Sequence, residues 1–187
     1  VLVDQLTGAL FPIASDVKIQ VEFDPSQIAE YRLIGYETRA LNREDFNNDA
    51  VDAGDLGAGH TVTALYEVTP VGSPARLSDQ LRYSSAAPTA GPSNELGYLK
   101  LRYKNPGEAT STLLETPILR DQIEGTEAHF AAAIAGFGQI LRGTDYITGW
   151  SIGDAIALAA ENRGADTFGY RAEAIRLMQL SESLRAD

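Results

Sequence analysis

The chain has 187 residues, and 44% of them are hydrophobic, a share typical of a protein that folds around an apolar core. Its formal net charge is −11 at pH 7. This acidity argues against nucleic acid or an anionic membrane as a partner, because binding either one depends on clustered Lys and Arg. The absence of cysteine excludes disulfides, thiolate catalysis and sulfur-ligated zinc or iron.

No apolar run approaches the roughly 20 residues that a membrane helix needs, so we expect no membrane insertion by this chain. The first residues, VLVDQLTGALF, contain neither an initiator Met nor a basic stretch, and therefore do not form a signal peptide. We expect the chain to be a piece of a longer protein. Leu2, Leu6 and Leu10 fall near one side at helical spacing, which predicts that residues 1–16 are the tail of a preceding domain and a connection.

Alternating apolar and polar residues predict strands in the first two thirds of the chain. In the first strand, Lys18, Gln20 and Glu22 fall on the solvent side. The turn sequence Asn105-Pro106-Gly107 predicts that the last two strands form a hairpin. The predicted strands are Val17–Phe23, Tyr31–Glu37, His60–Thr69, Leu99–Tyr103 and Thr110–Leu119. Between the third and fourth strands, Ser78–Asn94 is rich in Ser, Ala, Pro and Gly, which predicts a mobile excursion.

After Asp121 the apolar period changes to that of helices. Ser151 and Asp154 resemble a capping box at the start of the second of three predicted helices, and Gly143 can end the first. Each predicted apolar stripe needs a partner to cover it. The stripes are Phe130, Ile134, Phe137 and Leu141; Ile152, Ala155, Ile156 and Ala159; and Tyr170, Ala174, Leu177 and Leu184, the last flanked by Ile175 and Met178.

Strands first and helices last indicate the α+β class. We predict an antiparallel β-sandwich-like domain over residues 17–120. A bundle of about three short helices then follows as a helical subdomain over residues 121–187.

The segment from Glu44 to Gly59 has five acids, no base and no periodicity, and predicts a long loop. Its closely spaced oxygen ligands make calcium the metal to consider. The opening resembles an EF-hand loop, but Ala50 stands at the sixth position and Leu56 at the twelfth, where that motif needs Gly and Glu. Solvated Asp and Asn turns, or a position near the basic strand residues Lys100, Arg102 and Lys104, are the alternatives. The calcium candidates are Asp45, Asn47, Asp49 and Asp52, with Asp55 beside them.

The sequence lacks the motifs that enzyme chemistry would require. His60 is a candidate general base or ligand, or else a hydrogen-bonded structural residue, and His129 is too distant in sequence to form a recognisable metal pair with it. No phosphate-binding glycine loop and no G-x-S-x-G nucleophile motif occurs. We therefore expect no enzyme activity and no cofactor. An aromatic binding platform is a further hypothesis, with core packing as the alternative, for Tyr31, Tyr36, Tyr66, Tyr98, Tyr103 and Trp150.

Several blocks of the sequence are similar to the C-terminal region, of uncharacterised function, in bacterial YfbK-like proteins that contain a von Willebrand factor A domain. The blocks are VDQLTGALFPIASDVKIQVEFDP, AEYRLIGYETRALNREDFNNDAVDAGDLGAGHTVTALYEV, LKLRYKNPGEATSTLLETPI, FAAAIAGFGQILRGTDY and GYRAEAIRLMQLSES. The resemblance covers nearly the whole chain except Ser78–Asn94.

The resemblance implies that a von Willebrand factor A domain precedes Val1 as a partner in the same chain, and that the protein is exported to the periplasm or cell surface. The metal-site motif of that domain, D-x-S-x-S, is absent here, so no metal ligand is carried over. We expect a noncatalytic interaction module that contacts an as yet unidentified envelope protein. The alternative is a calcium- or glycan-binding module that uses residues 44–59.

Overall fold

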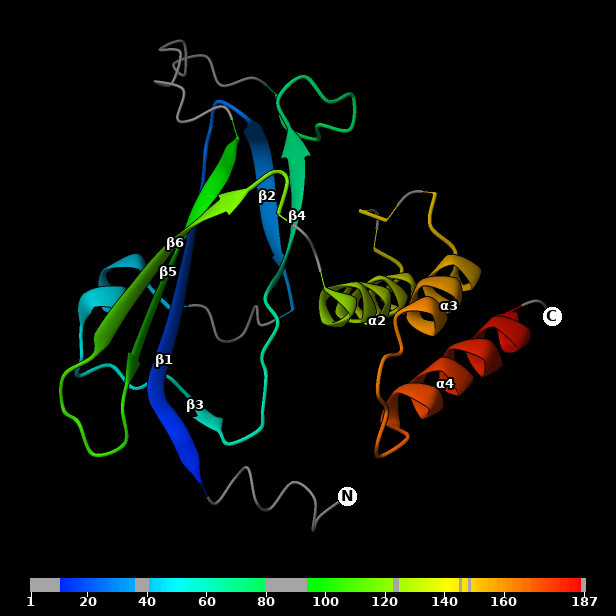
Figure 1. Cartoon of the computed structure of the whole chain (residues 1–187). Coiled ribbons are helices and arrows are strands. Elements are labelled where there is room, and N and C mark those ends of the chain that lie inside the picture. Colours follow the sequence, from blue (N-terminus) through cyan, green and yellow to red (C-terminus); the bar gives the residue numbers. More distant parts are fainter. Residues whose placement is uncertain are drawn as a thin grey trace. The chain divides into compact units, whose positions relative to one another are not determined.

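The computed structural model describes residues 11–35, 41–79, 94–122, 125–144, 146–147 and 149–185 (Figure 1). It confirms the α+β class, with antiparallel strands followed by three C-terminal helices. The chain divides into two compact units, Val1–Gln122 and Ile123–Asp187. The strands lie in the first unit, called the β unit below, and the helices lie in the second, called the helical unit.

The β unit contains a four-stranded and a two-stranded antiparallel sheet. Across the larger sheet, Ile19 of one central strand stands opposite Leu101 of the other, and Leu101 stands opposite Leu114 of an edge strand. The larger sheet has the order β3 (Gly54–Gly57), β1 (Pro12–Phe23), β5 (Glu95–Lys104), β6 (Thr112–Leu119), and the smaller pairs β2 (Ile28–Ile34) with β4 (Leu65–Pro70).

The first strand begins at Pro12 and not at Val17, where the predicted strand started. That residues 1–16 are the tail of a preceding domain and a connection stays a prediction. Pro12 pairs with Gly57, and the carbonyl of Phe11 accepts a hydrogen bond of 2.9 Å from the amide of Ala58. A proline fits here because the first residue of a strand does not need its own N–H in the ladder. Residues 1–10 lie outside the described part of the chain.

The predicted hairpin is confirmed, and its strands are longer on the β5 side than the alternation indicated. Tyr103 pairs with Thr112 next to the turn. The amide of Glu108 donates to the carbonyl of Asn105 at 3.0 Å, and Gly107 has a φ of 83°, which glycine adopts without strain.

The two remaining strands are shifted relative to their predicted ranges. The second starts earlier, at Ile28, and ends at Ile34, while residues 36–37 lie outside the described ranges. The strand predicted at His60 begins only at Leu65, and residues 60–64 are exposed and irregular. Threonine and valine favour strands only where a neighbouring strand exists, and here no partner reaches these residues in the described part of the chain. Most of the predicted excursion, residues 80–93, also lies outside the described ranges.

The helical unit holds α2 (Thr126–Arg142), α3 (Ile152–Glu161) and α4 (Tyr170–Arg185). The capping box is confirmed: the amide of Asp154 donates to Ser151 Oγ at 3.1 Å, and the amide of Ser151 donates to the Asp154 carboxylate at 2.8 Å. Gly143 ends α2 in the left-handed conformation, as predicted.

Many of the buried residues of this unit are small. In two of the helices the buried face therefore differs from the predicted stripe of large residues. Ala133 of α2 and Met178 of α4 are completely buried, whereas Leu141 and Leu177 are 50% and 57% exposed. The prediction that the large residues of α2 and α4 face the core was therefore wrong for Ile134, Leu141, Leu177 and Leu184. Alanine and glycine let helices approach closely, and Trp150 fills the space above Gly136. The core comprises Ala133, Ile152, Ala155, Ala159 and Met178.

No helix in the described ranges combines the length and the apolar character that crossing a membrane requires.

Two glycines of α2 provide a matched test of this packing. A Cβ on Gly136 would lie 1.6 Å from Cζ3 of Trp150, whereas a Cβ on Gly138 would meet no atom within 4 Å. Gly136→Ala is expected to lower the free energy of unfolding of the helical unit by about 1–3 kcal/mol because the indole must move. Gly138→Ala is expected to raise it by up to about 1 kcal/mol. Urea unfolding followed by fluorescence of the single tryptophan measures both, and equal effects would contradict the packing described.

Candidate functional site

The acidic segment is folded onto the larger sheet, and the prediction of a long loop without regular structure was wrong for part of it. It forms a short 3-10 helix, η2 (Arg43–Asn47), and strand β3. Phe46 anchors η2 and is only 5% exposed. A single buried phenylalanine has no periodicity, so sequence patterns could not reveal this anchor.

Lys18 of β1 holds the end of η2. Its side chain was predicted to face solvent, but it is only 3% exposed. The ammonium Nζ donates to the carbonyl oxygen of Asn48 at 2.5 Å and to that of Asp45 at 3.4 Å. The carbonyls at the end of a helical turn carry partial negative charge, so a lysine there satisfies them and is itself satisfied.

Lys104 of β5 forms the second attachment. Its Nζ donates to the carboxylate of Asp16 and, at 2.8 Å, to the carbonyl of Asp49. The Asp16 carboxylate also accepts from the amide of Ala53 at 3.1 Å, and the Asp49 carboxylate accepts from the amide of Ser111 at 3.3 Å. These contacts join β1, β5, the segment before β6 and the acidic segment in one polar network, which we call the lysine clasp: Asp16, Lys18, Asp49 and Lys104.

The predicted basic neighbours of the acidic segment are confirmed in part. The guanidinium carbon of Arg102 lies 5.8 Å from the centre of the Phe46 ring, and its Nη1 donates to Ser111 Oγ at 2.9 Å. Lys100 instead forms an ion pair of 3.8 Å with Glu115 of β6.

The clasp changes the acidity of its members. The hydrogen bond from Lys104 lowers the pKa of Asp16, and the Asp16 carboxylate in turn raises the pKa of Lys104. Hydrogen bonds from Ser111 lower the pKa of Asp49. All three shifts favour the charged forms, so Asp16, Asp49 and Lys104 are ions at neutral pH.

The calcium candidates are dispersed within the acidic segment. The Asp45 carboxylate accepts from the side-chain amide of Asn42 at 2.9 Å, and that of Asp49 is bound to Ser111. Asn47 and Asp52 are exposed. Among the described residues, no three His, Cys, Asp or Glu side chains gather as a metal ion would require. The positive charges against this segment come from Lys18, Lys104 and Arg102. Calcium binding stays a prediction.

The two histidines lie in different units. His60 is exposed in the irregular segment before β4, and its amide donates to the carbonyl of Gly57 at 3.1 Å. His129 lies in the first turns of α2 and is half-buried.

The residues of the predicted aromatic platform are also distributed over both units. Tyr31 and Tyr66 lie 4.9 Å and 5.5 Å from Phe23, measured between ring centres, and connect the two sheets of the β unit. Tyr31 is 58% exposed, while burial raises the pKa of Tyr66. Trp150 packs on Gly136 in the helical unit. Tyr36 lies outside the described residues.

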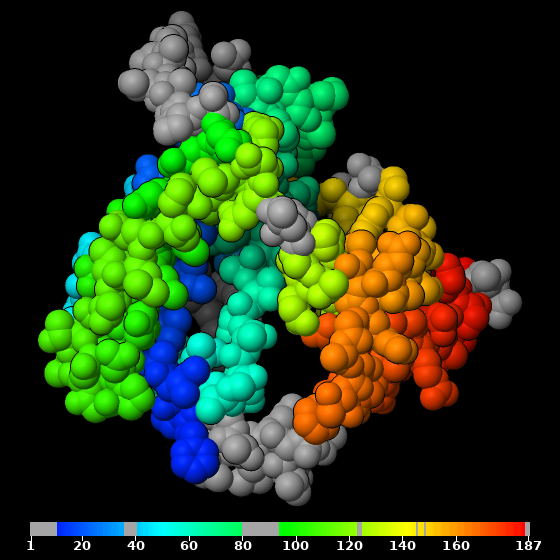
Figure 2. All heavy atoms as spheres, in the orientation of Figure 1, coloured from blue at the N-terminus to red at the C-terminus, as the bar shows by residue number. Residues whose placement is uncertain are grey.

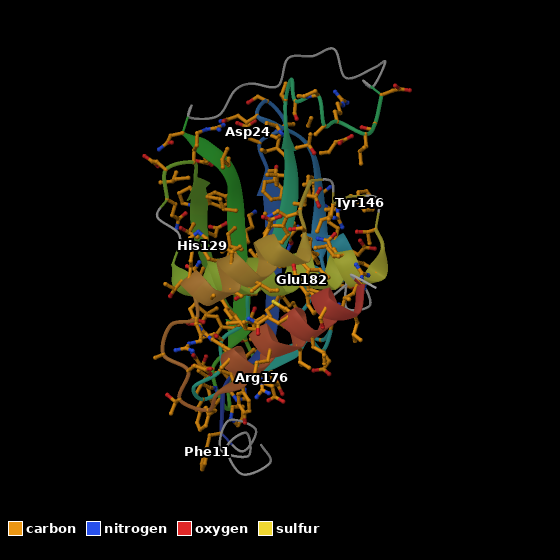
Figure 3. All side chains as sticks on the ribbon, turned by 90° about the vertical axis from the view of Figure 1, so that its right-hand side faces the viewer. Phe11, Asp24, His129, Tyr146, Arg176 and Glu182 are labelled. Carbon is orange, nitrogen blue, oxygen red and sulfur yellow. The ribbon has the colours of Figure 1, made fainter. Side chains whose placement is uncertain are left out.

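An exposed apolar row on α4 is the feature that the structure adds. Leu177, Leu180 and Leu184 are 57%, 55% and 69% exposed, and Tyr170 is 40% exposed. In Figure 2 the red atoms of the C-terminal half of α4 lie at the visible surface, and Figure 3 shows α4 with the exposed Arg176 and Glu182 labelled. The predicted stripe contains Leu177 and Leu184 but not Leu180. Its spacing of three from Leu177 was the available signal.

Fold and site together define a domain of the α+β class, in which a sheet carries a clasped acidic segment and a small helical unit exposes apolar residues. The chain belongs to the family described as "Uncharacterized protein YfbK, C-terminal", which matches residues 8–184. It is 41% identical over 187 residues to "Uncharacterized protein YfbK" of Escherichia coli strain K12, covering 98% of this chain and 32% of that relative. The chain thus spans about a third of the relative's length. No solved structure matches it.

Replacing Lys18 tests the buried attachment of the clasp. Lys18→Met removes the ammonium donor from the carbonyls of Asn48 and Asp45, and we expect a loss of about 1–3 kcal/mol in the free energy of unfolding of the β unit. Hydrogen exchange at the amide of Val51, which donates to Asn48 at 3.2 Å, is expected to accelerate by about tenfold. The control is Lys100→Met, because its ion pair with Glu115 is exposed and worth at most about 1 kcal/mol. Equal losses in the two variants would contradict a special role for Lys18.

The lowered pKa of Asp16 gives the clasp a defined pH dependence. The folded-state pKa lies below the unfolded value, so Asp16 contributes stability at neutral pH and loses it as pH falls through the folded-state pKa. We expect Asp16→Asn to be less stable than the parent at pH 7, with the difference shrinking below about pH 4. Asparagine tolerates the positive φ of 51° found at this position, so the backbone is retained. The urea midpoints of the parent and of Asp16→Asn are measured at pH 7 and below about pH 4. A difference in stability that is the same at both pH values would contradict a stabilising role for the Asp16 carboxylate.

Proposed function

We propose that the chain is a noncatalytic accessory module, and that it makes protein–protein contact within a longer cell-envelope protein that contains a von Willebrand factor A domain. The observation that carries the proposal is the exposed apolar row of α4. Scattered exposed apolar residues are common on protein surfaces, but a contiguous row of large ones is typical of an interaction site.

The share of the relative that this chain covers supports the same proposal. About a third of the relative corresponds to this chain, so a protein of that kind contains a large additional region. A module joined to a second region meets it at a high effective concentration, and even a modest apolar surface is then sufficient for contact. The von Willebrand factor A domain and the envelope location rest on the family resemblance given above.

The noncatalytic part of the proposal is supported by the positions of the ionisable groups. The aspartates with lowered pKa in the clasp are bound to Lys104 and Ser111, and a carboxylate engaged in this way stabilises the fold instead of awaiting a substrate proton. His60, the candidate base, is exposed at an irregular segment.

A comparison of three proteins tests the proposed contact: this chain, the additional region alone, and the longer polypeptide that contains both. We expect the additional region to unfold at a higher temperature in the longer polypeptide than alone, by roughly 2–8 °C for each kcal/mol of contact. Scanning calorimetry measures the transitions. If both regions unfold in the longer polypeptide as they do separately, the module makes no stabilising contact there and the proposal fails.

A further inference from the structure

Helix α4 carries apolar residues in two different directions. Ile175 and Met178 face the core of the helical unit, and Met178 is fully buried. Leu180 is 55% exposed and lies about 160° around the helix from Met178, because each residue turns the helix by about 100°. The exposed row is therefore a second apolar face and not the edge of the first.

The exposed residues follow the spacing by which one helix packs along another. Leu177, Leu180 and Leu184 stand at i, i+3 and i+7, and Tyr170 precedes Leu177 by seven positions, with the exposed Glu173 at the heptad position between them. A heptad row of this kind supplies knobs for the holes of a neighbouring helix. Arg176 and Ser183 border the row on one side and Ser181 on the other, so a polar rim surrounds it. We call Leu177, Leu180 and Leu184 the leucine row.

The size of the leucine row distinguishes between possible occupants. A stable interface between two free molecules buries about 800 Å² per partner and uses about 20–30 residues on each side. The leucine row and Tyr170 provide four large apolar residues on a single helix, which is too little for a dimer of independent copies. A segment joined to this chain by a peptide bond needs far less surface, because the tether removes most of the entropic cost of association.

The region that the relative contains in addition to this segment satisfies this requirement. The chain covers 32% of the relative, so roughly two thirds of such a protein is joined to the segment described here. We propose that the leucine row is the docking surface for an amphipathic helix of that additional region. The inference rests on the proposed function, since it names the surface and the kind of element that make the contact.

Cysteine labelling reads the surface directly, because the chain contains no cysteine of its own. Leu180→Cys is prepared in this chain and in the longer polypeptide, and the labelled peptide is quantified by mass spectrometry. The matched control is Gln179→Cys, on the neighbouring exposed position of the same helix. We expect Leu180→Cys to react at least about tenfold more slowly in the longer polypeptide than in this chain, while Gln179→Cys reacts equally in both.

A charge substitution separates failure of this inference from failure of the proposed function. In the longer polypeptide, Leu180→Glu is expected to abolish the calorimetric stabilisation of the additional region, and Gln179→Glu is expected to preserve it. If the stabilisation exists but Leu180→Glu leaves it intact, the module makes contact through another surface and the leucine row is wrong. If Leu180→Cys is already protected in this chain alone, the row is covered within the chain and the inference is also wrong. If the additional region is no more stable in the unsubstituted longer polypeptide than it is alone, both proposals are wrong.

Discussion

The β unit depends on two lysine ammonium groups that hold an acidic segment against a sheet. Lys18 and Lys104 reach main-chain carbonyls of Asn48 and Asp49 at 2.5 Å and 2.8 Å. Carbonyl oxygens and carboxylates around a cation are also the chemistry of calcium sites. Here the cations at these carbonyls are ammonium groups that are covalently part of β1 and β5. This arrangement holds the acidic segment against the central strands of a chain whose net charge is −11.

The strand predictions succeeded where the signals are local in sequence and failed where the structure depends on the docked acidic segment. Local signals were sufficient for the β5–β6 hairpin, because its turn and both alternating strands are adjacent in sequence. They were insufficient for β3, which pairs with β1 across a long connection and whose four residues include two glycines. The burial of Lys18 was likewise unpredictable, since alternation places it on the solvent side and only the docked segment covers it.

The helical unit shows a different limit of sequence patterns. The three helices, the Ser151 capping box and the end of α2 at Gly143 followed from caps and period. Which face of each helix is buried did not follow from the sequence pattern. Large apolar residues dominate any predicted stripe, whereas close packing of helices favours alanines at the buried positions. Gly136 under Trp150 makes this concrete, since a position without a side chain sets how α2 meets its neighbours. The leucines left outside by this choice are the ones that form the docking surface.

Three of the four completely buried residues in the core of the helical unit are alanines, and this has a consequence for how the unit is used. Ala133, Ala155 and Ala159 are fully buried but remove little apolar area from water, and small units have little core to spare. The larger apolar area of Leu177, Leu180 and Leu184 contributes to stability only when another element covers it. Covering the leucine row would therefore increase the stability of the unit itself as well as join it to its neighbour. Folding of the helical unit and contact with the rest of the protein are then thermodynamically linked, because anything that binds only the folded form stabilises it.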